Sequence, residues 1–278
     1  MWPRSHGLPT PDLNETNLMK IKTKFQIKQS LKLWVISLRF PLMADLSRPE
    51  NFLNHTRNFY LHAEGGVTLG VWHTLAASQW EEAHGGSPEW YRETLADDNP
   101  VIIYLHGNEG TRWDECGRKE TLELILMDAA GYHVLSLDYR GFGDSSGEPS
   151  EAGLTTDVVS LYQWVKKYSR QSPVYLWGHS LGTGSVYKIV FCVPFITAYI
   201  PFIFLCSLKT LTCPLLLLHA KDDSVVPYQM GVKLYQIALA THRERNEEAH
   251  VQMISYSADL GYSHSKIHMD PNLSHVVR

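Results

Sequence analysis

The sequence predicts an α/β fold built around a mostly parallel, twisted sheet flanked by helices. From residue 101 onward, short apolar runs typical of buried strands alternate with longer segments whose apolar residues recur at helical spacing. Loops rich in glycine and in serine, aspartate or histidine follow most of these strand runs. Alternating strands and helices indicate βαβ units, whose strand-to-helix loops gather at one edge of the sheet. We therefore expect the functional residues to lie in those loops.

The predicted elements follow one another along the whole domain. A hairpin of strands at 61–63 and 67–74 precedes a polar loop over 77–99. Beyond it we expect buried strands at 101–105, 133–138, 174–177, 215–219 and 251–256, and helices at 120–129, 155–168 and 228–240.

The chain has 278 residues, enough for one such domain and an N-terminal extension. We assign residues 46–278 to the domain and residues 1–45 to a disordered and basic amphipathic segment. Between Lys20 and Phe40, six basic residues interleave with apolar residues at helical spacing. This pattern fits a helix on a membrane surface, or one packed on the domain with its lysines in water. It is too short and too charged to span a bilayer.

Composition excludes several classes of function. The net charge is −4, which gives no reason to expect a nucleic-acid partner. The four cysteines form no Cys-x-x-Cys pair and lie at no zinc-finger spacing, so we expect free thiols and no metal site. Residues 1–30 lack the apolar region of a secretory signal peptide.

A glycine-serine-glycine motif supplies the candidate nucleophile. Gly178, Ser180 and Gly182 come directly after the apolar strand predicted at 174–177. A serine that attacks a carbonyl must project above the sheet edge from a sharp strand-to-helix turn. Glycines two residues to either side remove Cβ atoms that would clash in that turn. The motif therefore predicts Ser180 as a nucleophile.

A nucleophilic serine needs a histidine base, and the base needs an orienting carboxylate. Asp222 and Asp223 lie in the loop after the strand predicted at 215–219. We prefer Asp223 as the acid, with Asp222 as the alternative. The base is expected after the last strand, where we choose His264. Three other histidines stay open as the base: His250, His268 and His275.

Two backbone N–H groups are expected to form an oxyanion hole. The first belongs to Leu181, the residue after the nucleophile. The second is assigned to Asn108, in a glycine-rich loop that follows the strand predicted at 101–105. The segment from Asp138 to Ser145 also follows a strand, and we interpret it as a structural turn beside the site.

Five segments together carry a resemblance to a known family: Tyr104–Asn108, Asp138–Ser145, Val174–Gly184, Leu217–Pro227 and Asp259–His264. In this order they resemble the α/β-hydrolase-domain serine lipases that hydrolyse lysophosphatidylserine and monoacylglycerols. The match is closest to the type-twelve group, with its B paralogue favoured. The resemblance covers roughly residues 50–185 and 208–270.

The resemblance implies an α/β-hydrolase fold and ester hydrolysis through an acyl-enzyme, with no metal and no organic cofactor. It implies Ser180, Asp223 and His264 as the triad, and Asn108 and Leu181 as the oxyanion donors. The implied partner is a lipid ester. The resemblance also implies peripheral association with the endoplasmic reticulum membrane. Without that association, the protein is expected in the cytoplasm. The oligomeric state is not predicted.

Two features depart from the family pattern. The family has a membrane-spanning helix near its amino terminus, whereas this chain has only the charged 20–40 stretch. The interval between Ser180 and Asp223 is also short, and Pro194 interrupts the helix expected after the motif. We therefore predict an abbreviated form with an atypical apolar strand or lid over 186–212. Ile189–Cys206 is just long enough to span a bilayer, but one crossing would separate Ser180 from Asp223.

Two alternative functions remain. One is a catalytically impaired, membrane-associated interaction protein, which the shortened 186–212 region favours. The other is an acyl-protein thioesterase, which would use the same triad.

Overall fold

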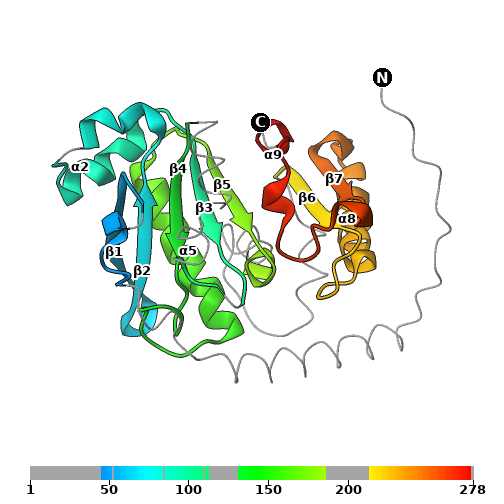
Figure 1. Cartoon of the computed structure of the whole chain (residues 1–278), viewed down its shortest axis with the longest axis horizontal. Helices are drawn as coiled ribbons and strands as arrows, with labels where there is room; N and C mark the ends of the chain where they lie inside the picture. Colours follow the sequence, from blue (N-terminus) through cyan, green and yellow to red (C-terminus); the bar gives the residue numbers. More distant parts are fainter. Residues whose placement is uncertain are drawn as a thin grey trace. The chain divides into compact units, whose positions relative to one another are not determined.

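The computed structural model describes residues 45–51, 53–83, 85–108, 110–112, 131–185 and 213–276 (Figure 1). The basic N-terminal stretch, the helix predicted at 120–129 and the atypical 186–212 segment lie outside the described residues. The domain limits placed at residues 45 and 46 therefore stay a prediction. Within the described ranges, no helix has the length and apolar character needed to cross a membrane.

Five strands form the larger sheet, in the order β1-β2-β4-β3-β5. Strands β1 (Thr56–Ala63) and β2 (Val67–Thr74) pair as the predicted antiparallel hairpin, and β2 continues antiparallel to β4 (His133–Leu137). Strand β3 (Val101–Leu105) is parallel to both β4 and β5 (Val174–Gly178). The predicted α/β fold is confirmed, with the hairpin as its antiparallel edge.

A second sheet contains β6 (Leu215–Ala220) and β7 (Val251–Tyr256), which are also parallel. Ala220 is the register partner of Tyr256, so the two strands end level with each other. In the larger sheet, Leu105 of β3 pairs in the same way with Gly178 of β5. Matched carboxyl ends bring the loops after each pair of strands to the same edge.

The central strands β3 and β4 are buried along their whole length. Their side chains alternate between two apolar clusters, because successive residues of a strand point to opposite faces. Ile103 and Leu135 pack in the cluster that α5 (Glu151–Tyr168) covers, whereas Ile102 and Val134 pack in the other. Each fully buried aliphatic side chain of this kind stabilises the fold by about 1.5–3 kcal/mol.

Helix α5 begins four residues before its predicted start at 155. The Oγ atom of Ser150 accepts a hydrogen bond from the N–H of Gly153 at 3.1 Å, which caps the helix. Its fully buried residues Val158, Leu161 and Val165 recur at helical spacing and face the sheet. Figure 1 shows α5 lying along β3 and β4.

The polar loop predicted over 77–99 contains helical structure, so that prediction was incomplete. Ser87 Oγ accepts a hydrogen bond from Trp90 N and starts α2 (Pro88–Glu93), with proline at its first position. Helix α8 (Tyr228–Arg243) extends beyond its predicted end at 240. The remaining short helical segments are η1 Pro49–Asn51, η2 Glu64–Gly66, η3 Ala77–Gln79, η4 Glu81–Ala83, η5 Thr94–Ala96, η7 Glu248–His250, η8 Ala258–Leu260, η9 Ile267–Met269 and α9 Leu273–Val276.

Strands β5 and β6 are less buried than β3 and β4. Tyr175 in β5 is 53% exposed and Leu216 in β6 is 36% exposed. Among the described strands, β5 pairs only with β3 and β6 pairs only with β7. In the described part of the chain, the two strands that flank residues 186–212 in the sequence therefore belong to different sheets.

A buried histidine pair joins β2 to β4. His73 Nε2 lies 3.2 Å from His133 Nδ1, and His133 Nε2 lies 3.1 Å from Asp97 Oδ1. Burial holds the pKa of His73 well below its ordinary value; the His133 ring lowers it further, and Asp97 opposes this in part. Burial alone would raise the pKa of Asp97, but hydrogen bonds from His133 and Asn99 lower it to about 2.

This pair predicts acid destabilisation. The folded protein keeps His73 neutral while the unfolded chain takes up a proton below about pH 6.5, so the free energy of unfolding falls as the pH falls through that value. Protonation of His73 in the unfolded chain should lower the free energy of unfolding by about 1.4 kcal/mol between about pH 7.5 and pH 5.5. Urea unfolding of wild type and His73→Gln at both pH values checks it. His62→Gln on β1 is the control, and an equal loss in wild type and His73→Gln would contradict the prediction.

Candidate active site

The turn after β5 is a sharp strand-to-helix elbow. Ser180 has a φ of 51°, a left-handed conformation that residues with a Cβ rarely adopt. A Cβ at Gly178 would lie 2.6 Å from the carbonyl group of Gly182, and one at Gly182 would overlap the carbonyl of Leu105. The two glycines are therefore required by close backbone packing, as the motif predicted.

Three distant residues meet at this elbow. His264 Nε2 lies 2.9 Å from Ser180 Oγ, and His264 Nδ1 lies 2.8 Å from Asp223 Oδ2. Ser180 comes from the end of β5, Asp223 from the loop after β6, and His264 from the loop after β7. The structure thus brings together the serine, carboxylate and histidine that the sequence predicted.

Hydrogen bonding assigns the tautomer of His264. The backbone N–H groups of Val225 and Val226 each donate to Asp223 Oδ1 at 2.8 Å. Burial alone would raise the pKa of Asp223, but hydrogen bonds from His264, Val226 and Val225 lower it below its ordinary value. An ionised carboxylate only accepts, so Nδ1 of His264 carries the proton. Nε2 then presents its lone pair to the hydroxyl of Ser180, the geometry needed to remove its proton.

The neighbouring aspartate has a different contact. Asp222 Oδ1 and Oδ2 lie 3.1 and 3.0 Å from the backbone nitrogen of Ser263. The structure therefore favours Asp223 over Asp222 as the partner of the histidine ring. The alternative histidines lie elsewhere: His250 in η7, His268 in η9 and His275 in α9.

The loop after β3 lies against the turn that contains Ser180. A Cβ on Gly107 would lie 3.4 Å from Ser180 Cβ and 3.2 Å from His179 Nδ1. Asn108 is the next residue and is half-buried, and Leu181 begins the helical turn that follows Ser180. Of the two predicted donor residues, Leu181 thus follows the serine in the chain, and Asn108 belongs to the loop that lies beside it. Within the described ranges, no cluster of His, Cys, Asp and Glu is arranged to hold a metal ion.

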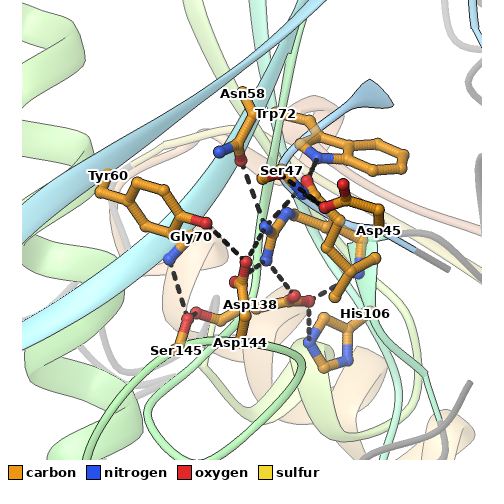
Figure 2. A network of polar contacts seen from close by, with 12 residues as sticks. Asp45, Ser47, Asn58, Tyr60, Gly70, Trp72, His106, Asp138, Asp144 and Ser145 are labelled. Atoms are coloured by element: carbon orange, nitrogen blue, oxygen red, sulfur yellow. Dashed lines mark hydrogen bonds and ion pairs between the residues drawn. The ribbon is translucent and has the colours of Figure 1, made fainter. Parts of the chain in front are cut away.

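A buried ionic network contacts the loop after β3. Sequence reasoning missed its central residue, Arg112. Arg112 is fully buried, and its guanidinium group bonds to both Asp138 and Asp144. Its backbone N–H donates to Asp138 Oδ1 at 2.6 Å, and that oxygen lies 3.6 Å from His106 Nε2. Figure 2 shows Asp138 between Asp144 and His106. The network thus connects the end of β4 to the loop that contains Asn108.

The segment 138–145 has the structural role that the sequence predicted. Ser145 Oγ donates to the Asp138 carbonyl and accepts from Gly70 N, both at 2.8 Å (Figure 2). Burial alone would lower the pKa of Arg112, but the charges of Asp138 and Asp144 and their hydrogen bonds raise it. In the sequence, only Asp138 and Asp144 point to a residue such as Arg112, because two carboxylates that follow a buried strand need a cation.

Removing this cation should destabilise the domain. Arg112→Met leaves the buried Asp138 and the partly buried Asp144 without their partner, so we expect a loss of about 3–5 kcal/mol in the free energy of unfolding. Urea denaturation measures it. Arg48→Met breaks only an exposed pair with Asp45 and should cost less than about 1 kcal/mol. Equal losses in the two variants would contradict the structural role of the network.

Strain at Ser180 predicts that glycine and alanine variants have opposite orders of stability at positions 180 and 160. Ser180→Gly and Ser180→Ala both remove the hydroxyl, but only glycine relieves the left-handed conformation, so Gly should be more stable than Ala by about 1 kcal/mol. At Ser160, within helix α5, the order should reverse by about 1 kcal/mol. Thermal unfolding of the four variants checks both signs. An Ala variant at 180 as stable as the Gly variant would contradict strain at this position.

Comparison with known proteins bears on the fold. A family model described as alpha/beta hydrolase fold matches residues 100–187. The solved esterase Pf2001 of Pyrococcus furiosus superposes with a TM-score of 0.59 at 17% identity, over 82% of this chain and 90% of that one. At this identity the likeness concerns the fold alone, and it confirms the α/β-hydrolase fold that the resemblance implied.

Two curated relatives are similar over most of the chain. Lysophosphatidylserine lipase ABHD12 of Xenopus tropicalis is 39% identical over 287 residues, which cover 87% of this chain and 73% of that protein. Protein ABHD12B of Homo sapiens is 38% identical over 282 residues, covering 86% and 76%. These identities do not separate the two paralogues. The chain belongs to the ABHD12 family of α/β-hydrolases.

Proposed function

We propose that this protein is a serine hydrolase that cleaves the carboxylic esters of lipids. The observation that carries the proposal is the continuous hydrogen-bonded chain from Ser180 through His264 to Asp223, at 2.9 and 2.8 Å. A serine hydroxyl gains nucleophilic strength only when a base is in contact with it and an acid orients that base. The contacts that meet both conditions lie at the carboxyl ends of β5, β6 and β7.

The first half of the reaction forms an acyl-enzyme. His264 Nε2 takes the proton of Ser180 as Oγ attacks the ester carbonyl, and the new C–O bond leaves a negative oxygen on the tetrahedral intermediate. When the intermediate collapses, the ester C–O bond breaks and the glycerol-side alcohol leaves with the proton held by His264. The ionised Asp223 stabilises the imidazolium form throughout.

The second half hydrolyses the acyl-enzyme. Water gives its proton to His264 and attacks the acyl carbon, and Ser180 recovers its proton when the fatty acid leaves. The backbone N–H groups of Asn108 and Leu181 are assigned to the developing oxyanion in both halves. Loss of one such donor typically raises the barrier by about 3 kcal/mol.

The proposed substrates are lysophospholipids, such as lysophosphatidylserine, and monoacylglycerols. The names of the relatives that are lysophosphatidylserine lipases support the first choice. We further propose peripheral contact with the endoplasmic reticulum membrane through the basic 20–40 stretch, because Lys and Arg side chains favour anionic lipid surfaces.

A fluorophosphonate probe tests the proposed nucleophile. Wild type should be labelled and Ser180→Ala should not, because the probe reacts with an activated serine hydroxyl. Ser160→Ala on α5 is the matched control and should label like wild type. Equal labelling of wild type and Ser180→Ala would refute the proposed function.

Turnover separates the candidate activities. Purified wild type should hydrolyse lysophosphatidylserine or monoacylglycerol, and Ser180→Ala or Asp223→Asn should lower kcat by at least about 10³-fold. Turnover of acyl-protein thioesters alone would instead favour the thioesterase, and no turnover by a folded, stable wild type would favour the impaired form.

A further inference from the structure

The main chain beside His264 adopts a conformation that must be held in place. Ser263 has a φ of 49°, the left-handed region that residues other than glycine rarely occupy. Such a residue costs of order 1–3 kcal/mol and persists only where surrounding contacts determine it. If the Ser263 backbone relaxed, the imidazole of His264 would move with it. The contacts that hold this dipeptide therefore control the distance from Nε2 to Ser180.

The first contact comes from the aspartate next to Asp223. Both carboxylate oxygens of Asp222 lie within 3.1 Å of Ser263 N, so the N–H of Ser263 donates to that carboxylate. Lys221 N also donates to the carbonyl of Tyr256 at 3.0 Å, which joins the ends of β6 and β7. Asp222 thus lies on a backbone already fixed against the strand that leads to His264.

The second contact comes from the histidine next to Ser180. His179 Nε2 lies 3.1 Å from the carbonyl oxygen of His264. A carbonyl only accepts, so Nε2 of His179 carries the proton and donates it. His179 N in turn donates to the carbonyl of Leu105 at 3.0 Å, at the end of the fully buried β3. The side chain therefore ties His264 to the most rigid part of the larger sheet.

We propose that Asp222 and His179 are positioning residues that together clamp the dipeptide 263–264 from both sides. One holds its N–H and the other its C=O, and each immediately precedes a proposed triad member, Asp223 or Ser180. With the backbone fixed and Asp223 bonded to Nδ1, the two side-chain torsions of His264 leave one place for Nε2, beside Ser180 Oγ. This inference rests on the proposed function, in which His264 is the base.

The clamp predicts a loss of kcat that a conservative variant reverses. Asp222→Ala and His179→Ala should each lower kcat about 10- to 100-fold, because a small misplacement of the base is costly. KM for a lysophospholipid should change little, since neither contact is made to substrate. Asp222→Asn keeps an oxygen acceptor and His179→Gln keeps an N–H donor, so both should recover most of kcat.

A double variant tests whether the two contacts act together. Side chains that hold one dipeptide should show coupled effects, so the kcat loss of Asp222→Ala/His179→Ala should differ from the product of the single losses. The rate of fluorophosphonate labelling gives a second readout of the same base. Multiplicative losses would show two independent effects and would overturn the shared clamp.

Controls keep this inference separate from the proposed function. Asp259→Ala removes an exposed carboxylate whose partner is Ser257, on the same loop, and His62→Ala removes a histidine on β1; both should keep wild-type kcat. If Ser180→Ala loses activity while Asp222→Ala and His179→Ala keep it, the clamp is wrong and the hydrolase stands. If Asp222→Ala unfolds, as thermal unfolding will show, the comparison of His179→Ala with His179→Gln decides, and equal losses in those two overturn the clamp.

Discussion

The left-handed conformation of Ser180 is the constraint on which the rest of the site depends. It turns the chain so tightly that the carbonyl of Leu105 in β3 occupies the space of a Cβ at Gly182. The elbow is therefore pressed against the neighbouring parallel strand, and the loop after β3 comes to lie beside the serine. A residue with a Cβ at position 182 would push β3 and β5 apart at this edge. The tight turn at Ser180 thus lies directly beside the loop that contains Asn108.

Apolar packing, and not the polar contacts alone, joins the second sheet to the first. Leu218 of β6 packs with Trp177 of β5 against the buried cluster that contains Ile102 and Tyr104. Both side chains are half-buried, so each contributes only part of the about 1.5–3 kcal/mol that full burial gives, while a hydrogen bond contributes a net of about 0.5–1.5 kcal/mol. Apolar packing and the hydrogen bonds of His264 therefore contribute free energies of similar size to holding the second sheet against the first.

The sequence predicted the strands, and the three side chains that meet after them, because both leave local signals. Ser180, Asp223 and His264 each follow a run of apolar residues, and the bounds predicted for β3 and β7 agree with the structure. Arg112 left no such signal: its partners are 26 and 32 residues away and only the folded chain brings them together. The start of α5 lies earlier than predicted because the Ser150 cap sets it, and apolar periodicity does not show a cap. Helix α2 has only six residues, too few for a clear periodicity.

The contrast between Asp222 and Asp223 shows where sequence reasoning reaches its limit. Two adjacent carboxylates in one loop are indistinguishable by composition, because either could reach a histidine that follows β7. In the structure, Asp223 is held by the N–H groups of Val225 and Val226 and faces the ring, while Asp222 faces the backbone of Ser263. The turn that follows β6 directs these two neighbouring carboxylates to different groups, so one loop contacts both the ring and the main chain next to it. That division explains why a pair of aspartates, and not a single one, serves a single histidine here.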